Sequence, residues 1–94
     1  MPVYVLSCID KANSLPLRMA TREAHIAYVG GHKDKTRIVG PLFSPAGEMA
    51  GSLLILEAPD LAAAEAFNAE DPYTKAGLWD HVDIHEFRAP LGQP

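Results

Sequence analysis

Two segments of the 94-residue chain are apolar on both sides of an extended backbone, which constrains the fold more than any other feature. Residues 53–56 read Leu-Leu-Ile-Leu, and residues 3–6 read Val-Tyr-Val-Leu. A strand with one face in water alternates apolar and polar residues. Neither segment alternates, so both predict strands in a sheet whose two faces are covered.

Four segments have the apolar, β-branched composition and the flanking turn residues of strands. They cover residues 3–9, 36–43, 51–58 and 80–89. The second should be bent or broken at Gly40–Pro41, because proline cannot donate a hydrogen bond to a neighbouring strand.

Helices separate these strands. Apolar residues at helical spacing predict a first helix that begins after the N-cap Ser14 and ends at Gly30–Gly31. A second helix follows the N-cap Asp60, and a one-turn helix covers residues 72–77. The order β-α-β-β-α-β predicts the ferredoxin-like α+β fold, an antiparallel sheet with the helices on one face.

The length of the chain predicts one domain, residues 1–94, ordered over about residues 2–89 with a loose tail at 90–94. Its helices suffice to cover only one face of the sheet. We therefore expect a second copy of the chain to cover the other face in a twofold homodimer. An apolar but uncovered surface is the alternative that the pattern leaves open.

The charge balance excludes two classes of partner. The formal net charge is −4 and there is no run of Lys or Arg, so we expect binding neither to nucleic acid nor to an anionic membrane surface. The longest apolar run, residues 53–56, is far too short to span a bilayer, and no signal peptide is predicted. The single cysteine, Cys8, is predicted to be a buried thiol in a cytoplasmic protein.

Candidate chemistry begins on the first helix. Arg22, His25 and Tyr28 are spaced by three residues, and Arg18 lies four before Arg22, so these side chains share one helical stripe. A nearby cation favours the neutral imidazole of His25, ready to accept a proton. A solvated helix face with a packed histidine explains the same spacing.

Asp71 precedes Pro72 at the start of the one-turn helix, which predicts an N-cap. The same geometry holds the carboxylate rigidly. If it lies near His25, it orients one ring nitrogen and leaves the other for a substrate. Sequence alone predicts the cap and leaves the chemical role open.

Other motifs give little sign of a cofactor. His81, Asp83 and His85 alternate on the last strand and share one face, but no closed four-ligand pattern is visible, and we expect no metal site. No glycine-rich phosphate loop and no nucleophile elbow occurs.

Taken together, the motifs resemble the YciI-like proteins. They are R-x-x-H-x-x-Y at residues 22–28, Gly40–Pro41, and D-P-Y-x-x-A-G-L at residues 71–78, and the resemblance extends from residue 3 to about residue 87. It implies the dimeric α+β barrel superfamily, with two sheets face to face. It also implies a catalytic pair, His25 and Asp71, in a pocket beside the sheet. The motif residues expected to bind substrate are Arg22, Tyr28, Pro41 and Tyr73.

The resemblance further implies proton transfer on small, often aromatic-derived compounds without metal or organic cofactor. The stretch from residue 42 to 51 is shorter than in many relatives, which affects one wall of the expected pocket. Two functions remain. The first is a cofactor-free acid–base enzyme of lyase, isomerase or dehydrochlorinase type, in which Arg22 binds an anionic group of a small anionic or aromatic-derived substrate. The second is a non-catalytic ligand-binding or accessory module.

Overall fold

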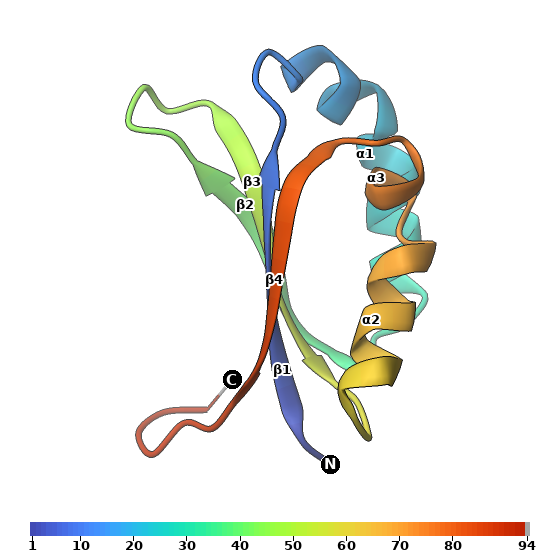
Figure 1. The fold of residues 1–94 in the computed structure, drawn as a ribbon, viewed down its shortest axis with the longest axis vertical. Helices are drawn as coiled ribbons and strands as arrows, with labels where there is room; N and C mark the ends of the chain where they lie inside the picture. The colour runs from blue at the N-terminus through green and yellow to red at the C-terminus, as the bar shows by residue number, and fades with distance from the viewer. Residues whose placement is uncertain (94) are drawn as a thin grey trace.

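The computed structural model describes residues 1–93 and has the predicted α+β architecture (Figure 1). The elements in chain order are β1 (Val3–Asp10), α1 (Leu15–Gly30), β2 (Thr36–Phe43), β3 (Met49–Glu57), α2 (Leu61–Glu70), α3 (Pro72–Lys75) and β4 (Trp79–Phe87). The predicted order is confirmed. β3 begins two residues earlier than expected, and β4 covers residues 79–87 instead of 80–89.

The four strands form one antiparallel sheet in the order β2-β3-β1-β4. The two central strands are therefore β3 and β1, the strands that are apolar on both sides. All helices lie on one face of the sheet, as predicted, and the other face is not covered by any part of residues 1–93 (Figure 1).

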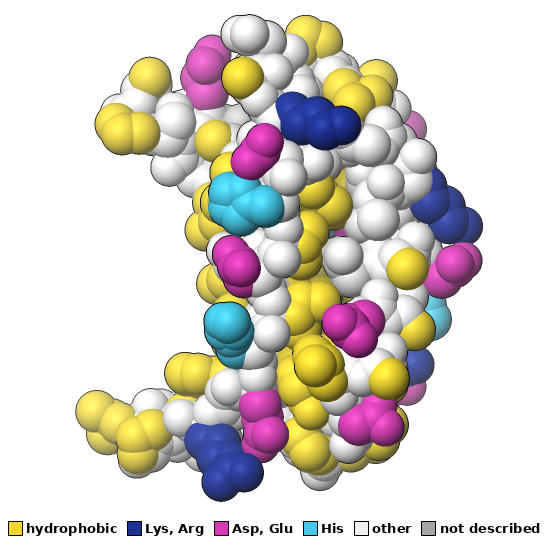
Figure 2. All heavy atoms as spheres, in the orientation of Figure 1, with side chains coloured by type: hydrophobic (Ala, Val, Ile, Leu, Met, Phe, Trp, Pro, Cys, Tyr) yellow, Lys and Arg dark blue, Asp and Glu magenta, His cyan; other side chains and the backbone are white. Residues whose placement is uncertain are grey.

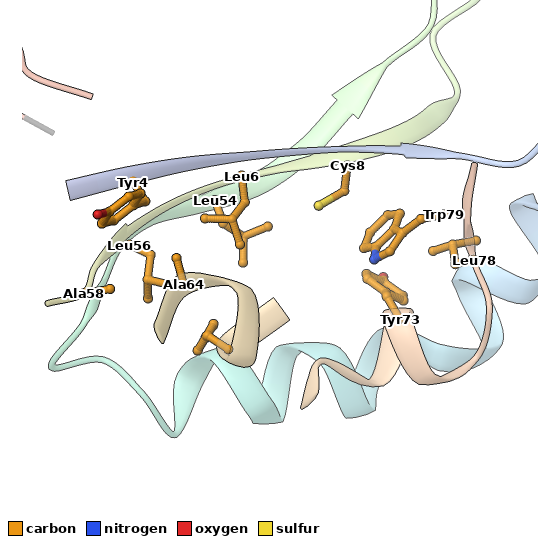
Figure 3. Close-up of a cluster of buried hydrophobic side chains, with 11 residues drawn as sticks. Tyr4, Leu6, Cys8, Leu54, Leu56, Ala58, Ala64, Tyr73, Leu78 and Trp79 are labelled. Carbon is orange, nitrogen blue, oxygen red and sulfur yellow. The ribbon is translucent and has the colours of Figure 1, made fainter. Parts of the chain in front are cut away.

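The core lies between the sheet and the helices. Alternate residues of β1 and β3 point to the helices, and the two sets pair across the strands, for example Leu6 with Leu54. Side chains from α2, α3 and the start of β4 complete the cluster (Figure 3). Its buried members are Tyr4, Leu6, Cys8, Leu54, Leu56, Ala58, Ala64, Phe67, Tyr73, Leu78 and Trp79.

The open face of the sheet has an apolar centre. Val5 of β1 pairs with Ile55 of β3, and Leu53 lies two pairs further along, opposite Ser7; Val5, Leu53 and Ile55 are partly exposed. On the edge strand β4, His81, Asp83 and His85 point to the same face, because they pair with the outward residues of β1. Figure 2 shows this face as a hollow between the β2–β3 hairpin and the C-terminal segment, with His and acidic side chains alternating along β4.

Two local predictions need correction. Ser14 is at the N-cap position of α1, but its side chain makes no capping hydrogen bond and donates instead to the Ala12 carbonyl. β2 is not broken at Gly40–Pro41, which pair with Leu53 and Ser52. Proline is accommodated because β2 is an edge strand. The Asp60 cap is confirmed, since its carboxylate accepts from the Ala63 N–H at 2.9 Å.

Residues 88–93 contain neither helix nor strand, and the last residue of the predicted loose tail, residue 94, lies outside the described residues. Within residues 1–93 no helix is long and apolar enough to cross a membrane. The same residues contain no group of three or more His, Cys, Asp or Glu side chains placed to hold a metal ion.

Candidate active site

The first helix presents its polar stripe to the sheet. Arg18 and His25, two helical turns apart, are only 2% and 5% exposed, whereas Arg22 between them is exposed. Residues seven apart lie on one face of a helix, so the burial of α1 takes both side chains inside. A helix face that holds a buried arginine and a buried histidine is not the solvated face that the spacing alone allowed.

Asp71 lies at the junction of two helices. It is the C-cap of α2 and the N-cap of α3, with an extended backbone (φ −63°, ψ 130°) of the kind that a following proline favours. Its Oδ1 accepts the Tyr73 N–H at 2.9 Å, and the residue is 1% exposed. The predicted cap is present, and it fixes the carboxylate inside the protein.

The fold brings His25 and Asp71 together across 46 residues of chain. Nδ1 of His25 lies 2.9 Å from Oδ1 and 3.0 Å from Oδ2 of Asp71. An ionised carboxylate only accepts hydrogen bonds, so Nδ1 carries the proton and donates it to Asp71. In the neutral ring, Nε2 then holds the lone pair. The His25 ring also stacks on Tyr73, with centroids 4.1 Å apart and planes 19° apart, so two contacts set its orientation.

A cavity of about 250 Å³ lies beside this pair. Its walls come from α1, β2, β3 and α3, and consist of Arg18, Arg22, His25, Ile26, Val29, Val39, Gly40, Pro41, Met49, Ser52 and Tyr73. A sealed apolar cavity of roughly 150 Å³ binds benzene. The cavity here is therefore large enough for one substituted ring. A smaller cavity of about 140 Å³, lined in part by Met1 and Pro59, contains neither His25 nor Asp71.

The structure unites most of the predicted site residues. Arg22, His25, Pro41 and Tyr73 line the cavity, and Asp71 supports His25 from behind. Tyr28 does not line it.

The Tyr28 hydroxyl instead donates to the Phe67 carbonyl at 2.8 Å, and its ring packs on Phe67. Burial, with the nearby charges of Asp71 and Glu70, raises the pKa of Tyr28 to about 12. Tyr28 thus joins α1 to α2, a role in packing that motif spacing could not separate from one in binding.

Arg18 lies on the predicted helical stripe without a predicted role, and three hydrogen bonds hold it in the cavity wall. Its Nε donates to Asp10 Oδ2 at 2.7 Å, and its Nη2 donates to Asp10 Oδ1 and to Ser52 Oγ, each at 2.9 Å. The guanidinium lies 4.7 Å from the ring centre of Tyr73 and 5.8 Å from that of Trp79. Burial opposes the charged form, but the hydrogen bonds and charge of Asp10 raise the pKa of Arg18.

The charged donors that face the cavity are arginines, with the carboxylates of Asp10 and Asp71 behind Arg18 and His25. The cavity wall contains two arginines and no Asp or Glu, although the whole chain has a net charge of −4. Burial raises the pKa of the Tyr73 phenol, against the opposite influence of Arg18 and Arg22, so the phenol is neutral at physiological pH. Such a wall suits a small molecule that has an anionic group.

Fold and site together define a small α+β protein with a preorganised histidine–aspartate pair beside an antiparallel sheet. The family model of the YCII-related domain matches residues 2–88, and the chain belongs to this family. It is 35% identical to Protein YciI of Escherichia coli over 94 residues, which cover 92% of this chain and 96% of that protein.

Solved structures of other proteins also resemble this chain. The 5-chloro-2-hydroxyhydroquinone dehydrochlorinase TftG of Burkholderia phenoliruptrix, in complex with 2,5-dihydroxybenzoquinone, is 30% identical with a TM-score of 0.87. The match covers 92% of this chain and 93% of that one. An antibiotic biosynthesis monooxygenase matches with a TM-score of 0.58 at 11% identity, over 97% of this chain and all of that one, which shows the fold alone.

Proposed function

We propose that this protein is an enzyme that transfers a proton on a small, anionic, single-ring substrate, with His25 as the general base and acid. Asp71 is the residue that orients it. The observation that supports the proposal most directly is the contact of Nδ1 with both carboxylate oxygens, at 2.9 and 3.0 Å, in the wall of a cavity of single-ring size. This arrangement leaves Nε2 as the atom that takes the proton.

Asp71 serves the reaction in two ways. It holds the ring in the tautomer that accepts a proton at Nε2, and its negative charge stabilises the imidazolium that forms. Because Asp71 is fixed by its hydrogen bond to the Tyr73 N–H, this stabilisation requires no rearrangement during the reaction.

The similarity to TftG suggests the reaction type to test first. In a dehydrochlorination the substrate loses a proton to a base, and chloride departs with the electron pair of the C–Cl bond. Loss of HCl needs no external oxidant or reductant, so a histidine base suffices. We propose His25 as this base, and a chlorinated or hydroxylated single-ring compound as the substrate.

The test measures turnover of 5-chloro-2-hydroxyhydroquinone and related ring compounds, monitored as released chloride and as the change in absorbance of the compound. Wild-type protein is compared with His25→Gln and with the control His32→Gln, which changes a histidine outside the cavity wall. Loss of the base should lower the rate by about 10²–10⁴-fold, and the control should keep its activity. Binding of these compounds without turnover by the wild type would favour the ligand-binding module instead.

We also propose that two copies pair through the open sheet face. Support comes from its partly exposed apolar centre and from the hollow between the β2–β3 hairpin and the C-terminal segment (Figure 2). Sedimentation should report about twice the chain mass of 10.2 kDa. Leu53→Lys should shift the protein to one copy, while Leu61→Lys, at an exposed apolar residue of α2, should not. A wild-type particle of single-chain mass would contradict the pairing.

A further inference from the structure

We propose that Arg18 anchors an anionic oxygen of the bound molecule, so that the cavity selects small planar oxyanions such as carboxylates, phenolates and enolates. The part of this inference that concerns reaction rests on the proposed function, whereas the part that concerns binding does not. Arg22, the cation first expected to bind an anion, then serves only as a secondary attraction at the surface.

The hydrogen bonds of Arg18 leave one edge of the guanidinium for a ligand. They use Nε and Nη2, which donate to Asp10 and Ser52, and none of them uses Nη1. Arg18 is nevertheless a wall residue of the cavity. A guanidinium is planar and its Nη1 has two N–H groups, so the same contacts that hold the side chain also fix the direction of these donors.

Rigidity distinguishes Arg18 from Arg22. Arg18 is 2% exposed, paired through two hydrogen bonds with Asp10 and packed on Tyr73 and Trp79. Arg22 is exposed. A donor that is already ordered loses little conformational entropy when a ligand binds. The charge of a buried donor is also screened far less by salt than that of an exposed one.

Stability alone does not account for a buried Arg18–Asp10 pair. Removing two charges from water is costly, and well-packed apolar residues of similar volume often stabilise a core as well or better. Here the pair is placed so that the guanidinium reaches a cavity wall with no acidic residue. A ligand-binding role explains this placement, with Asp10 keeping the arginine charged and in place.

The position of Arg18 also suits the chemistry of His25. Arg18 and His25 both line the cavity, and both pack on the Tyr73 ring, with 4.7 Å and 4.1 Å to its centre, so a ligand in the cavity can contact both side chains. When Nε2 takes a proton from a C–H or O–H group, the electron pair of that bond moves onto a conjugated oxygen. Arg18 holds this oxygen as its negative charge grows, and return of the proton from His25 restores the balance.

The experiment measures binding of two probes, benzoate and its neutral analogue benzamide, by calorimetry or NMR titration. Wild-type protein should bind benzoate more tightly. Arg18→Lys keeps a cation beside Asp10, but one ammonium cannot reach Asp10, Ser52 and the cavity together. Benzoate affinity should therefore fall about ten- to hundredfold, with benzamide affinity unchanged.

Arg22→Lys is the comparison at the exposed cation. It should weaken benzoate by about two- to threefold, and this effect should vanish in high salt, while the Arg18 effect persists. If Arg18→Lys does not fold, the neutral pair Asp10→Asn with Arg18→Gln should abolish the preference for benzoate. A wild-type complex with benzoate should place its carboxylate on Nη1 of Arg18.

Equal affinity of the wild type for the two probes would overturn the inference, as would a carboxylate held by Arg22 alone. So would an Arg18→Lys variant that keeps its benzoate affinity. The proposed function fails separately. His25→Gln should abolish turnover but keep benzoate binding. If the wild type binds benzoate through Arg18 but turns over none of the ring compounds, the proposed enzymatic function is refuted and the anion-binding site remains.

Discussion

Asp71→Asn separates the two roles of Asp71, because asparagine is as good an N-cap as aspartate. In the wild type, Oδ1 lies 2.9 Å from both His25 Nδ1 and the Tyr73 nitrogen, and Oδ2 lies 3.0 Å from His25 Nδ1. The amide oxygen of asparagine has two lone pairs and keeps the cap. Its NH₂ group, however, replaces the second oxygen and directs donors toward the donor of His25.

The cost to folding should be modest. A hydrogen bond to a charged group contributes about 1.5–3 kcal/mol, and a neutral one about 0.5–1.5 kcal/mol. The exchange should therefore lower the free energy of unfolding by about 1–2 kcal/mol. For a chain of this length that corresponds to a fall in Tm of about 5–15 °C.

The cost to activity should be much larger. Without the carboxylate, the His25 ring is no longer held in the tautomer that has its lone pair on Nε2, and the imidazolium loses its counter-charge. In hydrolases with a Ser-His-Asp triad, exchange of aspartate for asparagine lowers kcat by about 10⁴-fold. We expect a loss of about 10³–10⁴-fold, measured as initial rates at a temperature at which circular dichroism shows a folded variant.

Asp60→Asn is the matched control, since Asp60 caps α2 through the Ala63 N–H and lies outside the cavity wall. This variant should keep its activity. If Asp71→Asn retains a rate within about threefold of the wild type, Asp71 is only a helix cap and does not serve to orient His25 for proton transfer.

Three other predictions follow from the core and the glycines. Burial, with the charge of Asp71, raises the pKa of the Cys8 thiol from 9.0 to about 12, so native protein should resist thiol reagents at pH 8 and become labelled on unfolding. Because the Cys8 pKa is higher in the folded than in the unfolded state, the contribution of the neutral thiol to the free energy of unfolding is complete below pH 9 and is lost between pH 9 and 12. The loss is at most about 1.4 kcal/mol per pH unit, and Cys8→Ala should flatten the stability curve in this pH range. Gly51→Ala should destabilise by about 1–3 kcal/mol in denaturant titrations, because a Cβ at residue 51 would lie 2.5 Å from the Cys8 carbonyl oxygen. Gly30 is the last residue of α1, and a Cβ there would have no neighbour within 4 Å. Gly30→Ala should therefore raise the free energy of unfolding by up to about 1 kcal/mol, and a decrease would contradict the prediction that only a crowded Cβ destabilises.

The fold was predictable because its signals are local. Apolar runs marked the central strands, and Asp60 and Pro72 marked helix ends that the structure confirms. The errors came from tertiary context. Pro41 is accommodated because β2 is at an edge of the sheet, and sequence alone does not say which strand lies there.

The site was predictable only in part. Family resemblance paired His25 with Asp71 across 46 residues, a contact that no local pattern contains. Arg18 was placed on the helical stripe of His25 without a predicted role, because its partners, Asp10 and Ser52, lie on two strands that become neighbours only in the folded sheet. The shared helix face of Arg18 and His25 was visible in the sequence, but spacing alone does not tell a buried arginine from a solvated one.

Trp79 is the only tryptophan of the chain. Its ring packs edge-to-face with that of Tyr73 (Figure 3), and the Arg18 guanidinium lies 5.8 Å from its ring centre. Its indole N–H donates to Thr74 at 2.8 Å, which keeps the ring in place. Indole emission responds to nearby charge, so intrinsic fluorescence reports on the arginine directly. We expect a ligand that binds Arg18 to change this emission, so that unlabelled compounds can be screened in a plate reader without a known reaction.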